Sequence, residues 1–244
     1  ASPATIDIKV TSGGLTVNKN ITATGGSSGE ATITLTAQSG SINVTTPVSL
    51  SQTLIEAIGG PVGEGGGFAT VTLDASNSIL VDNATISTQG GSGGGAATVN
   101  LTAGTTIEVK NSSLIQAIGG DGIQGGGQAT VTLDAGTTIT VDGSMIQAIA
   151  GFATCGDCPP GVGGNATVRL IGPGGITVQN GSTVEAIGGN GFDSLGFGSG
   201  RGGNALVELC AGTFSVSCTP SGGITVNNSL VRAQGGDGGS FGGD

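Results

Sequence analysis

The chain has 244 residues, of which 52 are glycine, 36% are hydrophobic and only 9% are charged, and its formal net charge is -10. Six basic residues cannot supply the clustered cations that phosphate binding needs, so nucleic acid is excluded as a partner. No apolar run approaches the roughly 18 residues of a membrane span, and low charge with a positive mean hydropathy is unlike a disordered chain. The glycine must therefore have a structural use.

One unit recurs seven times along the chain, with starts near residues 4, 31, 69, 97, 129, 166 and 205. In each unit, three short segments carry apolar residues at positions i and i+2, the period of a strand with one buried face. The first segments carry Ile6/Ile8, Ile33/Leu35, Val71/Leu73, Val99/Leu101, Val131/Leu133, Val168/Leu170 and Val207/Leu209. The second segments carry Leu15/Val17, Ile42/Val44, Ile79/Val81, Ile107/Val109, Ile139/Val141, Ile176/Val178 and Ile224/Val226. The third segments carry Ile21/Ala23, Ile55/Ala57, Ile86/Thr88, Ile115/Ala117, Ile146/Ala148, Val184/Ala186 and Val231/Ala233.

A single unit is too small to bury a core, whereas stacked units share a continuous one. Three short strands per unit predict an all-β fold, a three-sided parallel β-helix of about seven coils that forms one domain over residues 1–244. The turn residues agree, because the second segments are followed by residues that tolerate a left-handed backbone. These residues are Asn83, Asn111, Gly143, Asn180 and Asn228.

The style of the repeat, as in residues 125–151, resembles that of filamentous-haemagglutinin-like exoproteins and related bacterial adhesins. The resemblance extends over nearly the whole chain. It implies a right-handed β-helix with a structural role outside the cell or at its surface, and it carries over no catalytic residue. The chain departs from that group in its unusually long glycine-rich segments and in showing no characteristic secretion domain.

The glycine-rich segments join the third strand of one unit to the first strand of the next, so they are expected to lie along one edge of the solenoid. Flexible, solvated loops are one interpretation of them. The other starts from the outward positions of the third strand, which are too apolar for a solvated face. We expect this stripe to be covered by the glycine-rich segments or by a neighbouring molecule. It comprises Leu54, Ile58, Leu114, Ile118, Met145, Ile149, Ile187 and Leu230.

The four cysteines predict two local disulfides, Cys155–Cys158 and Cys210–Cys218, because the other pairings would join points roughly 10 Å apart. Disulfides are typical of an exported protein. A metal or redox site at Cys155 and Cys158 is disfavoured, since the chain has no second Cys-x-x-Cys motif and no histidine.

The two ends of the chain are in phase, since it starts with a first strand and finishes in a glycine-rich segment. We therefore expect a structural subunit of an extracellular or cell-surface filament, which polymerises with itself head to tail through open ends. The predicted end-to-end interface comprises Ile6, Ile8, Leu15, Val17, Ile21, Leu209, Ile224, Val226 and Val231. The main alternative is a segment of a larger secreted adhesin, for which cell-surface or matrix components are candidate partners.

An enzyme is disfavoured, because the recurring carboxylates Asp74/Asp134 and Asp82/Asp142 are separated by an intervening unit and the chain lacks histidine and tyrosine. Ice binding by outward threonines of the first strands, such as Thr32/Thr34, is a further alternative, but Asn100 and Arg169 interrupt the array. We expect no cofactor and no metal.

Overall fold

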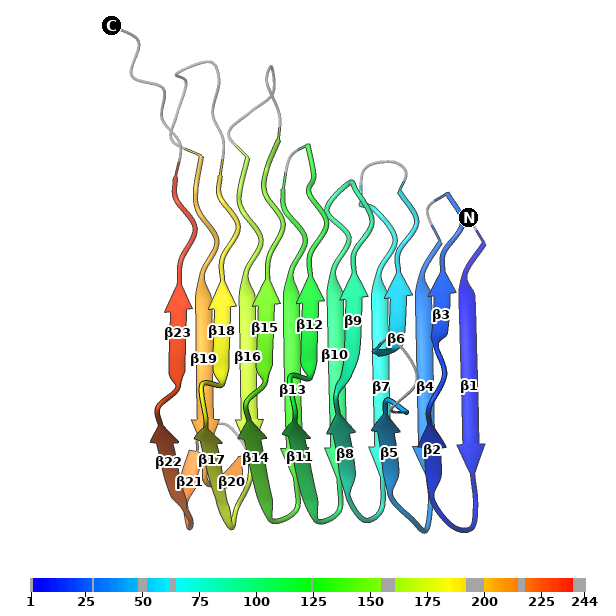
Figure 1. Ribbon diagram of the computed structural model, residues 1–244. Helices are drawn as coiled ribbons and strands as arrows, with labels where there is room; N and C mark the ends of the chain where they lie inside the picture. The colour runs from blue at the N-terminus through cyan, green and yellow to red at the C-terminus, as the bar shows by residue number, and fades with distance from the viewer. Residues whose placement is uncertain are drawn as a thin grey trace, which may run out of the picture.

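The structure is a computed structural model, which describes residues 2–27, 29–47, 52–61, 65–123, 125–154, 161–191, 200–214 and 218–238. Its strands form three parallel sheets of seven strands each, and the chain visits the sheets in turn as it advances along the axis (Figure 1). The predicted three-sided parallel β-helix of seven coils is confirmed.

Each sheet takes one strand from every coil. The first sheet contains β1 (Ala4–Val10), β4 (Ala31–Ala37), β7 (Ala69–Ala75), β10 (Ala97–Ala103), β13 (Ala129–Ala135), β16 (Ala166–Ile171) and β19 (Ala205–Cys210). The second contains β2 (Leu15–Val17), β5 (Ile42–Thr45), β8 (Ile79–Asp82), β11 (Thr106–Lys110), β14 (Thr138–Asp142), β17 (Gly175–Gln179) and β22 (Gly223–Asn227). The third contains β3 (Ile21–Thr24), β6 (Thr53–Ile58), β9 (Ala84–Gln89), β12 (Leu114–Ile118), β15 (Met145–Ile149), β18 (Thr183–Ile187) and β23 (Leu230–Gln234).

The alternating residues set the register of the sheets. Val99 pairs with Val71 on one side and with Val131 on the other, and Leu101 pairs likewise with Leu73 and Leu133. These inward side chains are fully buried in the interior coils, so like residues stack on like along the whole core. Each such side chain contributes about 1.5–3 kcal/mol by leaving water, and a slip of one residue would turn the apolar set outward.

A left-handed residue turns the chain from the second strand towards the third. The predicted positions are confirmed, with φ of 50° at Asn83, 58° at Asn111, 55° at Gly143, 59° at Asn180 and 47° at Asn228. Buried serines continue this corner. The backbone N–H of Ser113 donates to Ser144 Oγ, that of Ser144 to Ser182 Oγ and that of Ser182 to Ser229 Oγ, each at 3.2 Å. The ladder satisfies amides that would otherwise be buried without a partner.

At the opposite corner, where the third strand leads back to the first, glycines of successive coils approach one another directly. One glycine after each third strand and one before each first strand alternate in an unbroken chain of N–H···O=C hydrogen bonds of 2.6–3.1 Å. We call this chain the glycine seam, and in bonded order it comprises Gly26, Gly29, Gly60, Gly67, Gly91, Gly95, Gly120, Gly127, Gly151, Gly164, Gly189, Gly203 and Gly236. The seam extends each coil beyond its strands along one edge (Figure 1).

The seam accepts no side chain. A Cβ on Gly120 would lie 2.0 Å from the carbonyl oxygen of Gly91, and a Cβ on Gly151 would lie 2.0 Å from that of Gly120. At their bases, the described glycine-rich segments are therefore joined from coil to coil by backbone hydrogen bonds, which the interpretation as flexible, solvated loops did not include. The reason is that only glycine lets two backbones pack this closely.

Candidate assembly interfaces

The first coil exposes residues whose counterparts in the interior coils are fully buried. Ile6, Ile8, Leu15 and Ile21 are half-buried, whereas Val17 is only 5% exposed. Among the described residues, each strand of this coil pairs on one side only, β1 with β4, β2 with β5 and β3 with β6. The predicted interface residues of this coil thus lie together at one end of the described solenoid.

The last coil is open in the same way. Ile224 and Val226 of β22 are 48% and 46% exposed, although their partners Ile176 and Val178 in the preceding coil are buried. Leu209 and Val231 are half-buried, and β19, β22 and β23 are the terminal strands of their sheets. A terminal strand presents a row of backbone N–H and C=O groups that another strand can pair with.

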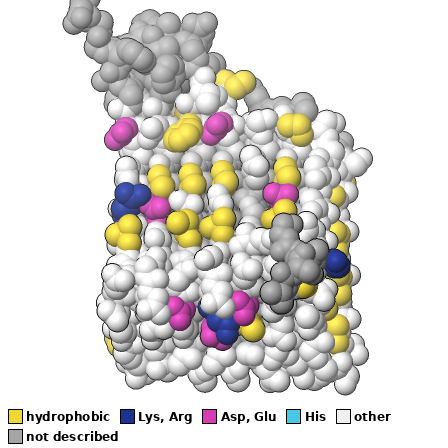
Figure 2. All heavy atoms as spheres, in the orientation of Figure 1, with side chains coloured by type: hydrophobic (Ala, Val, Ile, Leu, Met, Phe, Trp, Pro, Cys, Tyr) yellow, Lys and Arg dark blue, Asp and Glu magenta, His cyan; other side chains and the backbone are white. Residues whose placement is uncertain are grey.

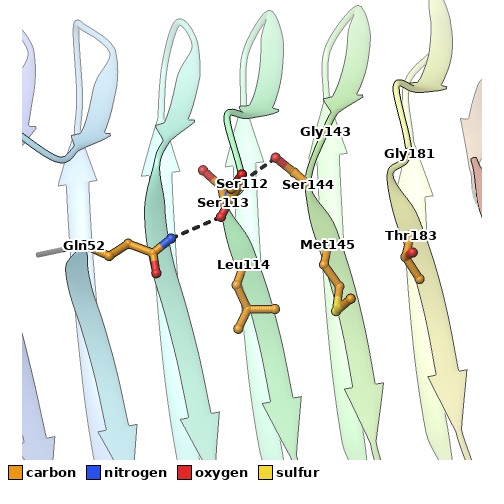
Figure 3. A pocket seen from close by; sticks show the side chains of 9 residues that line it. All are labelled: Gln52, Ser112, Ser113, Leu114, Gly143, Ser144, Met145, Gly181 and Thr183. Atoms are coloured by element: carbon orange, nitrogen blue, oxygen red, sulfur yellow. Dashed lines mark hydrogen bonds between the residues drawn. The ribbon is translucent and has the colours of Figure 1, made fainter.

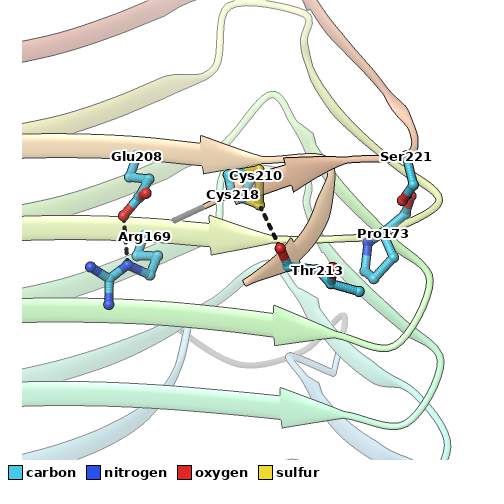
Figure 4. Close-up of a disulfide and its surroundings, with 7 residues drawn as sticks. All are labelled: Arg169, Pro173, Glu208, Cys210, Thr213, Cys218 and Ser221. Atoms are coloured by element: carbon cyan, nitrogen blue, oxygen red, sulfur yellow. Dashed lines mark hydrogen bonds and ion pairs between the residues drawn. A yellow bond between two sulfur atoms is a disulfide. The ribbon is translucent and has the colours of Figure 1, made fainter. Parts of the chain in front are cut away.

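A hairpin interrupts the last coil between its first and second strands. Its strands β20 (Gly212–Phe214) and β21 (Cys218–Pro220) are antiparallel, and the predicted disulfide Cys210–Cys218 ties it to β19 with a Cα–Cα distance of 5.5 Å (Figure 4). The Ser221 hydroxyl donates to the Pro173 carbonyl at 2.9 Å, and β22 still pairs in register with β17. The insertion therefore leaves the strand ladder intact. Cys155 and Cys158 lie outside the described residues.

The predicted apolar stripe forms two parallel rows on the outer face of the third sheet (Figure 2). One row contains Leu54, Leu114, Met145 and Leu230, and the other contains Ile58, Ile118, Ile149 and Ile187. Met145 is 38% exposed and Leu230 is 48% exposed, while the others are half-buried.

Described glycine-rich residues border one end of the second row. Gly120, Asp121 and Phe152 line a hollow together with Ile118 and Ile149, and Phe152 is itself 43% exposed. Cover by a neighbouring molecule therefore stays a prediction for the greater part of the stripe.

A second hollow, of about 370 Å³, lies beside the first row, at the corner that contains the buried serines Ser113 and Ser144. Leu114, Met145 and Thr183 form one wall, and Gln52 stands at one end (Figure 3). Gln52 donates to the Ser112 carbonyl at 3.1 Å and accepts from the Thr85 hydroxyl at 2.9 Å, which anchors it two coils away from its own corner. The sequence pattern did not indicate this contact, because residue 52 belongs to an insertion without a counterpart in the other units.

The carboxylates that recur at equivalent positions are held apart as expected. Thr102 pairs with both Asp74 and Asp134, and Lys110 pairs with both Asp82 and Asp142. Two of these carboxylates accept hydrogen bonds from the corner asparagines, Asp82 from Asn111 at 2.7 Å and Asp142 from Asn180 at 2.6 Å. Among the described residues, no group of three or more metal-ligating side chains occurs.

The outward threonines of the first sheet align in register. One column contains Thr5, Thr32, Thr70, Thr98, Thr130 and Thr167. The neighbouring column is mixed, because it contains Asn100 and the ion pair of Arg169 with Glu208 at 2.8 Å. A regular two-column threonine array is thus limited to part of the face.

Comparison of the chain with protein-family models, with curated proteins and with solved structures finds no match. The resemblance to the haemagglutinin-like exoproteins therefore stays a prediction. In the part of the chain that the structure describes, no helix is long and apolar enough to cross a membrane.

Proposed function

We propose that the protein is a structural subunit that stacks head to tail into an extracellular filament. The observation that carries this proposal is the pair of open coils. At both ends of the described solenoid, strand edges are unpaired and inward-facing aliphatic side chains are exposed that interior coils bury completely. Burying such side chains is favourable by about 25 cal/mol for each Å² removed from water.

The two open surfaces are complementary because every coil repeats the same register. A second copy stacked on the last coil would pair its β1 with β19, its β2 with β22 and its β3 with β23. Ile6 and Ile8 would then lie on Val207 and Leu209, continuing the two apolar columns of the first sheet. A contact between two different surfaces of one molecule does not close on itself, so it generates a fibre.

The extracellular location rests on the disulfide Cys210–Cys218, because disulfides persist in oxidising compartments. A segment of a larger secreted adhesin remains the alternative, in which further coils of the same chain would cover these strand edges.

Electron microscopy of the purified chain tests the proposal. We expect long unbranched fibres with an axial repeat of about 33 Å, which is seven coils at the spacing of parallel strands. Separate rods of one subunit length would contradict the filament and favour the segment of a larger protein.

A matched pair of variants tests the interface itself. In β22, Ile224 points inward onto the open surface, whereas the next residue, Thr225, points outward. We expect Ile224→Lys to abolish fibres, because it places a charge in the buried contact, and Thr225→Lys to leave them intact. Fibres of unchanged length with Ile224→Lys would place the contact elsewhere.

A further inference from the structure

The outer face of the third sheet carries three columns of side chains that run along the solenoid axis. In order from β6 to β23, the first column contains Leu54, Thr85, Leu114, Met145, Thr183 and Leu230. The second column contains Glu56, Ser87, Gln116, Gln147, Glu185 and Arg232. The third column contains Ile58, Gln89, Ile118, Ile149, Ile187 and Gln234.

The first column has the same order of residue types, aliphatic or threonine, when it is followed in either direction along the axis. It reads Leu-Thr-Leu from β6 to β12 and Met-Thr-Leu from β15 to β23, so that aliphatic residues and threonines mirror each other about a point midway between β12 and β15. At that midpoint the second column has Gln116 beside Gln147, and the third has Ile118 beside Ile149. The first column and these central pairs are self-complementary under a two-fold rotation. The rest of the third column is not, because Ile58 mirrors Gln234 and Ile187 mirrors Gln89.

The second column carries one pair of opposite charges at mirrored positions, whereas Glu185 mirrors the uncharged Ser87. Arg232 lies in the last coil and Glu56 in the second, at equal distances from the midpoint. Glu185, only 5% exposed, accepts from Arg232 and from Gln147, so its charge is already balanced within the chain. The side chain of Arg232 remains 47% exposed and is available to a second carboxylate.

We propose that two copies of this chain pair face to face through their third sheets, related by a two-fold axis parallel to the strands. The axis passes between β12 and β15, and the two solenoids are antiparallel. Met145 of one copy packs on Leu114 of the other, Leu230 packs on Leu54, and Arg232 pairs with Glu56. This lateral contact uses neither open end, so it does not rest on the head-to-tail filament.

The other two-fold rotation that brings these faces together has its axis along the solenoid. It would place Glu56 opposite Glu56 and Arg232 opposite Arg232, and like charges across an interface are unfavourable. The charges therefore select the antiparallel arrangement.

The area of the face sets the strength of the contact. Three columns over six coils span about 13 Å by 24 Å between Cα atoms. With the side chains at the rim this is on the order of 500–600 Å² per copy, at the low end for a specific complex. A single pair is therefore weak, and any array of subunits would strengthen it by multivalency.

Cross-linking with a short bismaleimide tests the proposal on the full chain. Met145→Cys lies near the axis, and its Cα is expected about 11 Å from its mate, from a sheet spacing of about 10 Å and an offset of one coil. Leu54→Cys is the matched control, because it lies in the same column but about 26 Å from its mate. We expect cross-linked dimers with Met145→Cys and none with Leu54→Cys or with the parent chain.

This readout is independent of head-to-tail stacking, which would separate successive copies of residue 145 by about 33 Å. Failure to form fibres would therefore leave the lateral prediction intact, and the reverse also holds. Equal yields from the two cysteine variants, or no dimer from Met145→Cys, would overturn the pairing. Cross-links between Leu54→Cys and Ile58→Cys chains would show the parallel arrangement and overturn the antiparallel one.

A charge variant gives a second test. In the Met145→Cys background, Glu56→Lys places two cations opposite each other, and we expect the dimer yield to fall about two- to fivefold. Glu30→Lys makes the same charge change at an exposed position off this face and should leave the yield unchanged. An equal effect of both substitutions would refute the predicted contact between Arg232 and Glu56.

Discussion

Substitution of one seam glycine should destabilise the solenoid far more than substitution of a glycine five residues away. In Gly120→Ala, the new Cβ would lie 2.0 Å from the carbonyl oxygen of Gly91, 2.7 Å from its carbonyl carbon and 2.8 Å from the oxygen of Gly90. All three atoms belong to the backbone of the preceding coil, so no side-chain rotation relieves the clash. Gly125→Ala is the control, because its Cβ would meet only the Val162 carbonyl oxygen, at an ordinary contact distance of 3.6 Å.

The magnitude follows from packing and hydrogen bonding. Overpacking typically costs about 1–3 kcal/mol. The shift of more than about 1 Å that Gly120→Ala requires would also weaken two seam hydrogen bonds, to Gly95 at 2.8 Å and from Gly127 at 2.7 Å, each worth about 1 kcal/mol. We therefore expect Gly120→Ala to lower the free energy of unfolding by about 3–5 kcal/mol. Gly125→Ala should leave it unchanged or raise it by up to about 1 kcal/mol, because alanine restricts the unfolded chain.

Urea unfolding followed by far-UV circular dichroism measures both values. Hydrogen exchange should also show lost protection in Gly120→Ala at residues 90–95 of the preceding coil and at residues 119–123 and 125–127 around the substituted position. Equal stabilities of the two variants would refute the seam as a close-packed element. The glycine-rich segments would then be solvated loops.

Three further substitutions test other parts of the fold. Thr88 is fully buried and, among the described side chains, its hydroxyl has no hydrogen-bond partner. Thr88→Val should therefore raise the free energy of unfolding by about 1–3 kcal/mol. Thr53→Val should lower it, because the Thr53 hydroxyl donates to the Thr45 carbonyl at 3.0 Å. Thermal unfolding distinguishes the increase from the decrease. Asn180→Val should lower the free energy of unfolding by about 1–3 kcal/mol, because a β-branched residue is strained at φ 59° and the hydrogen bond to Asp142 is lost. A melting temperature equal to that of the parent chain would contradict this. Replacing Cys210 and Cys218 together by serine should lower the free energy of unfolding by about 2–3 kcal/mol. Hydrogen exchange should detect this as weaker protection of the last coil. Protection equal to that of the parent chain would show that the disulfide does not stabilise this coil.

The coil could be predicted from the repeat pattern alone. Apolar residues at i and i+2, repeated in seven units, are compatible with one register only, and the stacking of Val99 between Val71 and Val131 follows from aligning the repeats. The corner at Asn111 was predictable because the chemistry is local, a tight turn that needs a residue tolerant of positive φ. The pairing of Cys210 with Cys218 was predictable for the same reason, since the two residues are near neighbours in the chain.

The role of the glycines and the surroundings of particular side chains could not be predicted in this way, because they depend on how the coils pack together. Glycine has no side chain, so no periodicity indicates whether Gly120 lies in solvent or against Gly91; that depends on how closely two coils approach. Likewise, Gln52 reaches Ser112 through an insertion that the repeat does not encode, and the unpartnered hydroxyl of Thr88 is evident only once its neighbours are placed. The repeat specifies which faces are buried because burial follows an alternating pattern along one strand. It cannot specify contacts between backbones that lie far apart in the chain, because those depend on distances in three dimensions.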